Sequence, residues 1–255
     1  MASIRTFQSA LFALAIVGAP ALASAQSFSG PQRSEIENII REYLLAHPEV
    51  LEEVSAELSK RQTAAEALKH ETAVTTNAQA IFSSPRGVTI GNRDGDVSFV
   101  EFFDYNCGYC KRAMTDMLEL MKSDPKLKVV LKEFPVLGPG SVEAAQVAVA
   151  VRMQDPSGKK YLDFHQKLLG GRGQADKARA MAAAKEAGLD MAKLEKDLTS
   201  PEIRATLEEN YKLAESMGMN GTPSYVIGKQ VVVGAVGVDA LREKIGVARC
   251  GKATC

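Results

Sequence analysis

Apolar residues recur every three or four positions from residue 34 to about residue 80, which predicts helices and no strand in this segment. Ser34-x-x-Glu37 has the form of a capping box, and Pro48 interrupts the pattern at the point where a second helix is predicted to begin. The apolar positions then continue as Leu51, Val54, Leu58, Ala65 and Leu68. This stripe must be buried, either on the chain's own domain or on copies of the chain.

Downstream, short β-rich runs alternate with helical runs. Strands are predicted at residues 97–103 and 127–134 with a helix between them, after a connector of turn residues at 81–96. Residues 141–217 are predicted to be helical in several pieces. A hairpin is predicted at 224–227 and 230–233, followed by a last helix at about 238–247. Strands separated by helices predict an α/β fold with a mixed sheet covered on both faces.

Charge and composition narrow the function. The 255 residues carry 31 basic and 31 acidic side chains, and apolar residues make up 45%. This composition excludes a polytopic membrane protein and offers no net charge to attract nucleic acid. Residues 35–71 have a net charge of −5, so this segment would not seek acidic lipids or phosphate backbones.

The first 25 residues have the pattern of a cleaved signal peptide. Arg5 is their only charge, an apolar run covers residues 10–19, and Ala23-Ser24-Ala25 fits a cleavage site. The alternative is an uncleaved N-terminal helix. We expect a mature chain that begins at Gln26 and is exported to a bacterial periplasm, where disulfides persist.

Cys107-Gly108-Tyr109-Cys110 lies where a predicted strand passes into a helix. Thiolate is the reactive form of cysteine, and the N-terminus of a helix favours negative charge, so Cys107 should be the more acidic thiol. Cys110, one turn later and facing inward, should be the resolving thiol. The alternatives are a purely structural disulfide or a zinc half-site, although the three histidines have no zinc-knuckle spacing. We favour redox chemistry, with no cofactor and no metal.

Two motifs carry a resemblance to a known family. Residues 101–111, which read EFFDYNCGYCK, look like the active-site stretch of the DsbA-like thiol-disulfide oxidoreductases, and residues 221–225, GTPSY, resemble the family's cis-proline loop. The resemblance extends over roughly residues 88–247. It implies a thioredoxin fold with an inserted helical domain, and Pro223 in cis opposite Cys107. Thr222 would then lie beside the disulfide and tune it.

The resemblance also divides the chain into parts. After the signal peptide at 1–25, residues 26–80 form an N-terminal helical oligomerisation segment. Residues 81–140 form the first part of the thioredoxin fold, 141–217 the inserted helical domain, and 218–255 the second part with the cis-proline loop and the last helix.

Several other side chains are candidates for the site. Glu101 matches the position of a buried acid in the family, and a buried carboxylate beside the inner thiol could relay its proton. Lys132 on the neighbouring strand is its expected partner, and the alternative for both is a solvated strand-edge charge. His165 is expected to be structural. Met217 and Met219 could line a peptide groove or pack in the core.

Cys250 and Cys255 lie beyond the region of resemblance. Four intervening residues allow a local disulfide in an exported chain, and we interpret the pair as a terminal clip that adds little to global stability. A labile regulatory pair and a metal site are the alternatives.

Residues 34–80 resemble the oligomerisation helices of the ScsC-like branch of the family, some of whose members form trimers, and Cys-Gly-Tyr-Cys resembles the motif of the isomerase DsbC. This favours an oligomeric disulfide isomerase or reductase that acts on exported client proteins and is kept reduced by a membrane partner. The first alternative is a monomeric DsbA-like oxidase. The second is a binding module that captures soft metal such as copper(I) on the two cysteines.

Overall fold

The computed structural model describes residues 28–255. The predicted signal peptide at residues 1–25 lies outside the described residues. The chain divides into two compact units between Leu58 and Ser59, and each is described by itself. Within residues 28–255, none of the helices combines the length and the apolar character that crossing a membrane requires.

Two helices occupy the N-terminal segment, α1 (Gly30–Ala46) and α2 (Glu49–Thr76). Pro48 lies immediately before α2, as its fixed backbone angle favours. The prediction that Ser34 and Glu37 cap the first helix is wrong, because α1 begins at Gly30. There the Gln32 side chain accepts a hydrogen bond from the Ser29 backbone N–H at 2.9 Å. The first unit buries no residue of α1, so its apolar stripe is exposed.

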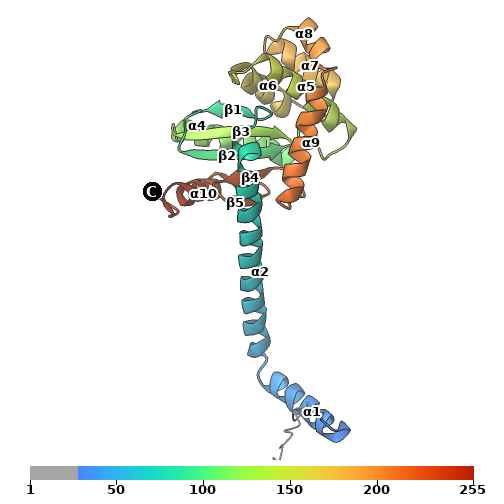
Figure 1. The fold of residues 1–255 in the computed structure, drawn as a ribbon, viewed down its shortest axis with the longest axis vertical. Coiled ribbons are helices and arrows are strands. Elements are labelled where there is room, and N and C mark those ends of the chain that lie inside the picture. Colours follow the sequence, from blue (N-terminus) through green and yellow to red (C-terminus); the bar gives the residue numbers. More distant parts are fainter. Residues whose placement is uncertain (1–27) are drawn as a thin grey trace, which may run out of the picture. The chain divides into compact units, whose positions relative to one another are not determined.

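A five-stranded mixed sheet forms the centre of the second unit (Figure 1). Its strands are β1 (Val88–Gly91), β2 (Val97–Phe103), β3 (Leu127–Glu133), β4 (Ser224–Ile227) and β5 (Gln230–Val233), in the order β1-β3-β2-β4-β5. Only β2 and β3 are parallel neighbours, and the other three pairings are antiparallel.

The prediction of a connector of turn residues at 81–96 is wrong for residues 88–91, which form strand β1. The four-residue strand lies between turn residues, and its alternating buried side chains, Val88 and Ile90, are too few to stand out as a periodic pattern. The strand exists because it pairs antiparallel with β3, a long-range contact that the local sequence does not reveal.

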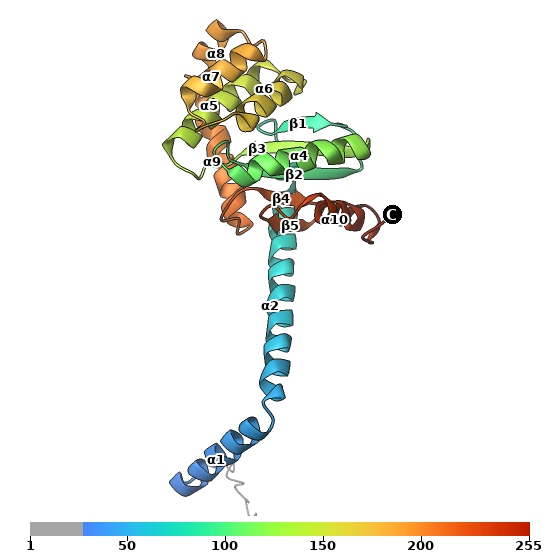
Figure 2. The ribbon, with the colours of Figure 1, turned by 180° about the vertical axis from the view of Figure 1, so that it is seen from behind.

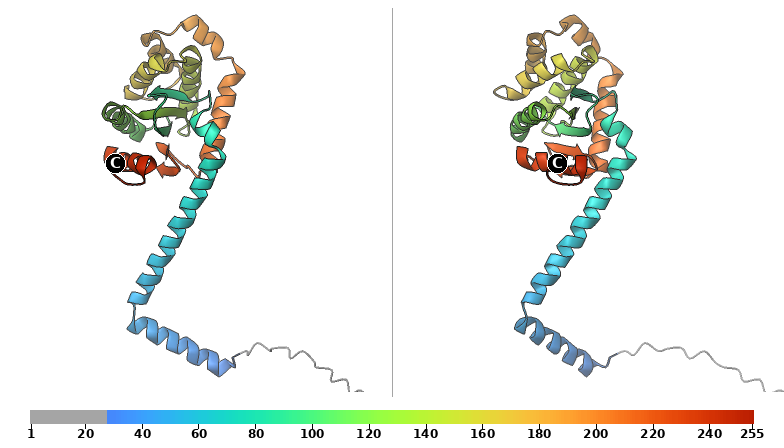
Figure 3. Two further views of the ribbon diagram at one scale, coloured as in Figure 1. Left: turned by 60° about the vertical axis from the view of Figure 1, so that its left-hand side comes forward. Right: turned by 90° about the vertical axis from the view of Figure 1, so that its left-hand side faces the viewer.

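Helices cover both faces of this sheet. Figure 2 shows α4 (Gly108–Ser123) in front of the sheet, and Figure 3 shows α4 and α10 (Val238–Cys250) on one side with α3 (Ala78–Phe82) and α9 (Pro201–Ser216) on the other. The side chains of β2 alternate accordingly, since Phe99 and Phe103 pack with α4 while Val100 and Phe102 pack with α9.

Between β3 and β4 the chain forms five helices, beginning with α5 (Pro139–Gln154) and α6 (Lys159–Gly170). They continue with α7 (Lys177–Glu186) and α8 (Met191–Asp197) and end with α9. The alanine- and valine-rich α5 is buried along its second half and packs against its neighbours. Met217 and Met219, just after α9, are buried in the core on the α9 face of the sheet, so they pack rather than line a groove.

Candidate active site at the start of helix α4

Cys107 is the N-cap residue of α4, at the end of the loop that follows β2. Its Sγ accepts a hydrogen bond from the backbone N–H of Cys110 at 3.3 Å, so the reactive sulfur takes the place of the oxygen that usually caps a helix. The following Gly108 and Tyr109 form the first turn, and Tyr109 is exposed. The two cysteines are therefore one helical turn apart and hydrogen-bonded at the positive end of the helix dipole.

The two thiols differ strongly in acidity. The pKa of Cys107 is lowered to about 6, chiefly because the Cys110 side chain hydrogen-bonds the Cys107 sulfur, with further help from Thr222 and the backbone N–H groups of the first turn. Burial raises the pKa of Cys110 far above its usual value, and its hydrogen bond to Cys107 raises it further. Near neutral pH, one sulfur is thus a thiolate and the other holds its proton.

The loop before β4 lies against these cysteines. The Thr222–Pro223 peptide bond is cis, and Cys107 Sγ lies 3.2 Å from the Thr222 carbonyl oxygen, to which it donates a hydrogen bond when it is protonated. The structure thus brings Cys107 and Cys110 together with Thr222 and Pro223, although the two pairs are more than a hundred residues apart in the sequence.

Glu101 lies on β2 beneath α4 and is 2% exposed. Its pKa is raised to about 8, first because burial penalises the carboxylate and then because the negative charges of Cys107 and Asp116 repel it. A buried carboxyl that titrates near neutral pH beside a thiol is able to exchange a proton with it.

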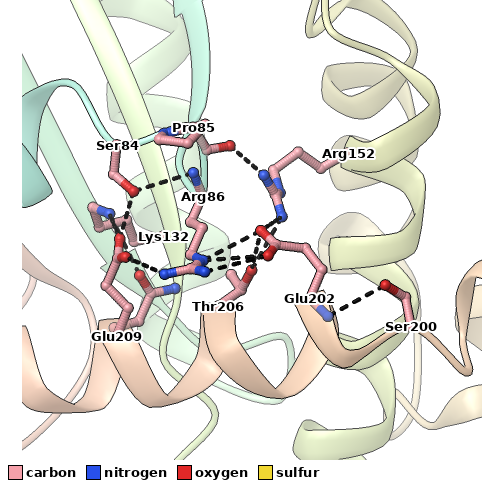
Figure 4. Close-up of polar contacts among 10 residues, drawn as sticks. Ser84, Pro85, Arg86, Lys132, Arg152, Ser200, Glu202, Thr206 and Glu209 are labelled. Carbon is pink, nitrogen blue, oxygen red and sulfur yellow. Dashed lines mark hydrogen bonds and ion pairs between the residues drawn. The ribbon is translucent and has the colours of Figure 1, made fainter.

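Lys132 is not the partner of Glu101, contrary to the prediction from the sequence. The β2–β3 register pairs Glu101 with Leu131 and places Lys132 opposite Phe102, so the lysine points to the other face of the sheet. There it belongs to a group of charges that we call the α9 charge cluster, shown in Figure 4. Its members are Arg86, Lys132, Arg152, Glu202 and Glu209.

The profile of the DSBA-like thioredoxin domain matches residues 99–246, a stretch that includes both cysteines, Glu101 and the cis-proline loop. The chain belongs to the DSBA-like thioredoxin family. A second profile, the N-terminal domain of the copper resistance protein ScsC, matches residues 32–65.

Solved structures agree with this membership. A thioredoxin-like oxidoreductase from Silicibacter pomeroyi is 40% identical, with a TM-score of 0.64, and the match covers 67% of this chain and 96% of that one. Proteus mirabilis ScsC in a transitional conformation is 28% identical with a TM-score of 0.63, over 88% of this chain and 97% of its own. The fold is therefore the thioredoxin fold of DsbA-like proteins, with a helical insertion and N-terminal helices.

Curated relatives include disulfide bond formation protein D of Bacillus subtilis, 28% identical over 61% of this chain and 74% of that protein. The chain also matches the Na⁺/H⁺ antiporter NhaA 1 of Salinispora arenicola at 24% identity, over 63% of this chain. It spans about a quarter (24%) of that antiporter's length.

Asp104 and Asn106 hold the loop between β2 and α4, and neither was predicted from the sequence to have a role. The buried Asp104 carboxylate accepts hydrogen bonds from the backbone N–H groups of Asn106, Val136 and Leu137 at 2.7–2.9 Å. Asn106 donates to the Ala175 carbonyl at 2.9 Å and accepts from the Ala175 N–H at 2.6 Å. Asp and Asn between a strand and a helix are the available signal, because such side chains often organise the adjoining turn.

His165 is structural, as expected. It is 2% exposed, burial lowers its pKa to about 3, and its ring packs edge-on against Phe103 with centroids 4.6 Å apart. Its Nδ1 lies 3.3 Å from the Tyr105 hydroxyl, so this neutral imidazole joins the insert to the active-site loop.

A surface cavity of about 420 Å³ opens beside Cys107. One wall is Lys111, whose Nζ donates to the Gly170 and Gly171 carbonyls at 2.7 and 3.0 Å and so fixes α4 to the end of α6. Leu137 and Leu169 supply apolar surface on the same cavity. Cys107 therefore lines an open surface cavity that has both polar and apolar walls.

Cys250 and Cys255 form a disulfide at the other end of the domain, where the tail after α10 is exposed. The structure therefore holds one cysteine pair bonded and one, Cys107 with Cys110, as free thiols. Within residues 28–255, no group of three or more His, Cys, Asp or Glu side chains is placed to hold a metal ion.

Proposed function

We propose that Cys107 and Cys110 are the catalytic dithiol of a protein thiol-disulfide exchange enzyme, with Thr222, Pro223 and Glu101 around them. The observation that carries this is the split in acidity between a thiolate at the N-cap of α4 and a buried thiol one turn later. The first can attack while the second keeps its proton until it is needed.

The reaction balances as two exchanges. The Cys107 thiolate attacks one sulfur of a client disulfide, a Cys107–client disulfide forms, and the other client sulfur leaves as a thiolate. Cys110 then loses its proton and attacks the Cys107 sulfur, which releases the second client thiolate. The client disulfide gains two electrons and the Cys107–Cys110 pair loses two. Run backwards, the same steps oxidise a client dithiol.

We further propose that the enzyme works in the periplasm as an oligomeric isomerase or reductase, with a trimer as the favoured state and a membrane partner that keeps it reduced. Support comes from the N-terminal segment, where large apolar side chains are exposed and the ScsC profile matches. In the first unit these side chains include Ile39, Ile40, Tyr43, Leu45, Leu51, Val54 and Leu58. Copies of the same segment supply the matching apolar surface, and several dithiols in one assembly favour repeated attack on one misfolded client.

Light scattering and the reactivation of a scrambled multi-disulfide protein test the proposal together. The reduced mature protein should be an oligomer and should reactivate the client. A variant with Leu51, Val54 and Leu58 changed to Gln should be a monomer and lose most of the reactivation, while keeping its exchange rate with a small disulfide. Glu53→Gln with Lys60→Gln, two exposed polar positions on the same helix, is the matched control and should change neither property.

Other outcomes separate the alternatives. A monomeric wild-type protein would refute the oligomer. No reactivation together with fast oxidation of a reduced client by the disulfide form would favour the DsbA-like oxidase. Copper(I) binding at one equivalent that needs both Cys107 and Cys110, with no exchange activity, would favour the metal-binding module.

A further inference from the structure

Two polar atoms are buried without a hydrogen-bond partner directly beneath the cysteines, Glu101 Oε2 and the Tyr225 hydroxyl. Glu101 is 2% exposed and Tyr225 is 1% exposed. Buried polar groups are almost always paired with protein or with an internal water, and an unpaired one costs free energy. Two such atoms below a reactive thiol therefore call for a functional explanation.

The two residues are neighbours by strand pairing. The antiparallel register of β2 and β4 places Glu101 directly opposite Tyr225, so their side chains leave the same face of the sheet. That face is the one covered by α4, and Tyr225 packs in the same core cluster as Cys107 and Cys110. Phe99, whose ring centroid is 5.2 Å from that of Tyr225, keeps the surroundings apolar.

The charges that raise the pKa values of Glu101 and Tyr225 belong to residues at the start of α4 and along it, and to Glu101 itself. Cys107 and Asp116 act on Glu101, and the same two groups with Cys110 and Glu101 act on Tyr225. Asp116 lies one turn after the buried Ala113 and is only partly buried, so its carboxyl reaches both the core edge and solvent. Cys110, Glu101, Tyr225 and the partly exposed Asp116 are thus close enough to one another to interact electrostatically.

We propose that the Tyr225 hydroxyl holds an internal water between Glu101 and Asp116 and so completes a path by which the Cys110 proton reaches solvent. Tyr225 is a positioning residue in this path, because it acts through the water and the Glu101 carboxyl. The proposal rests on the proposed role of Cys107 and Cys110 as the catalytic dithiol.

The proton balance follows from the resolving step. As Cys110 attacks the Cys107–client disulfide, its thiol proton passes to the Glu101 carboxylate, a bond forms between the two cysteine sulfurs, and the client sulfur leaves as a thiolate. Glu101 then returns to its carboxylate by passing a proton through the water toward Asp116 and solvent. In the oxidising direction each transfer is reversed. Glu101 is able to serve both directions because its pKa, about 8, lies close to neutral pH.

Tyr225→Phe tests the proposal because it removes the hydroxyl and keeps the buried ring. The reduced full-length protein is mixed with oxidised glutathione, the reaction is quenched with acid, and mass spectrometry follows the mixed disulfide on Cys107. The chain has no Trp, so mass rather than fluorescence is the readout. In the wild type, the resolving rate should rise with pH as Glu101 ionises.

In Tyr225→Phe, resolution should slow about tenfold near neutral pH and its rise should move to higher pH, while the alkylation pKa of Cys107 stays unchanged. Asp116→Asn should act in the same direction, and the double variant should be no slower than Tyr225→Phe alone. Tyr211→Phe is the matched control, since that hydroxyl bonds the Pro135 carbonyl beside the core on the other face of the sheet.

The outcomes separate this proposal from the one on which it rests. A wild type that forms no mixed disulfide with glutathione would refute the catalytic dithiol itself. An active wild type with Tyr225→Phe resolving at the same rate and with the same pH profile would refute the path alone. A variant slowed equally at every pH would assign Tyr225 to packing and would also overturn the proposal.

Discussion

The two faces of the central sheet differ in how their charged side chains are paired. On the face covered by α9, the charges of the α9 charge cluster are paired with one another (Figure 4). On the face covered by α4, Glu101 is 2% exposed, whereas the arginines and acids of the cluster are partly exposed. The Glu101 Oε2 has no hydrogen-bond partner, and the charges that act on this carboxyl are negative. The difference shows in acidity, because the pKa of Glu101 is raised while that of Glu202 is lowered.

The α9 charge cluster joins three parts of the second unit. Arg86, before β1, reaches Glu209 at 2.9 Å and Glu202 at 3.3 Å on α9, and Arg152 of α5 reaches Glu202 at 3.0 Å. Burial by itself would raise the pKa of Glu202, but hydrogen bonds from Arg152 and Arg86 outweigh it. Glu202, held in this way, keeps its charge at neutral pH and helps to fix α9, the helix that leads to the cis-proline loop.

The two regions are therefore suited to different roles. Paired charges are stable in one protonation state, which suits a structural joint. An unpaired carboxyl with a pKa near 8 changes protonation state easily, which suits proton transfer.

The largest effect should come from Cys107→Ser, which removes the thiolate and with it the attack on a client disulfide. Exchange with a model disulfide should fall by about three orders of magnitude or more. Cys110→Ser is the informative partner variant, because it keeps the attacking thiolate and should accumulate the mixed disulfide instead. Mass spectrometry of acid-quenched reactions counts both species, and a mixed disulfide on the Cys107→Ser variant would reverse the assignment of the two cysteines.

Glu209→Gln should cause the next largest effect, on stability. It removes the negative charge that lies 3.7 Å from the Lys132 ammonium, which is 0% exposed and also donates to Asn210 Oδ1 at 3.4 Å. Leaving a buried charge unpaired costs about 4 kcal/mol of unfolding free energy. Urea unfolding measures this loss of free energy, and Glu208→Gln, on the exposed side of the same helix, is the control. Adding Lys132→Met to Glu209→Gln should recover part of the loss, and a loss equal to that of Glu208→Gln would contradict a structural role for the cluster.

Much of the α4 side could be predicted from the sequence because its signals are local. The run at residues 97–103, the Cys-x-x-Cys spacing and the Thr-Pro of the loop before β4 each lie within a few residues. The partner of Glu101 could not be predicted in the same way. Lys132 and Leu131 are adjacent in sequence, and a shift of one residue in register decides which of them shares a face with Glu101.

Strand β1, Asp104 and Asn106 were missed for a related reason. Each depends on contacts with residues 32 or more positions away, such as the pairing of β1 with β3, the bond from Val136 to Asp104 or the bonds from Asn106 to Ala175. A four-residue strand and two polar loop residues leave no periodic pattern. Long-range pairing decides their structure, and one sequence without partners in view does not display it.

Glu101→Gln should sharpen the comparison through its pH dependence. Glu101 holds its proton up to a pKa of about 8 in the folded protein and up to its usual 4.5 in the unfolded chain. Unfolding of the wild type therefore becomes easier as pH rises from about 4.5 to about 8, because the unfolded chain gains by ionising first. The Glu101→Gln variant cannot ionise and does not lose stability in this way. Its unfolding free energy should exceed that of the wild type by about 3 kcal/mol at neutral pH and differ little below the pKa of the unfolded chain.

Urea unfolding at a series of pH values is the measurement for Glu101→Gln. The difference between variant and wild type should grow with pH and level off above the folded pKa. Glu119→Gln, an exposed acid on α4, is the control and should give no such trend. A difference that is constant with pH would mean that Glu101 does not hold its proton in the folded protein.

The smallest effect should come from removing the C-terminal clip with Cys250→Ser and Cys255→Ser. The bond joins residues only 5 positions apart, and the tail that it holds is exposed, so the loss of unfolding free energy should be about 1 kcal/mol.

Cys250 also differs from Cys107 in position, since it is the last residue of α10 and Cys107 caps the start of α4. The negative end of a helix disfavours a thiolate just as the positive end favours one, so a reduced Cys250 should exchange slowly. Alkylation of the fully reduced protein in mildly acidic solution should label Cys107 before Cys250. Exchange activity that falls in the double variant would show instead that the clip takes part in the redox cycle.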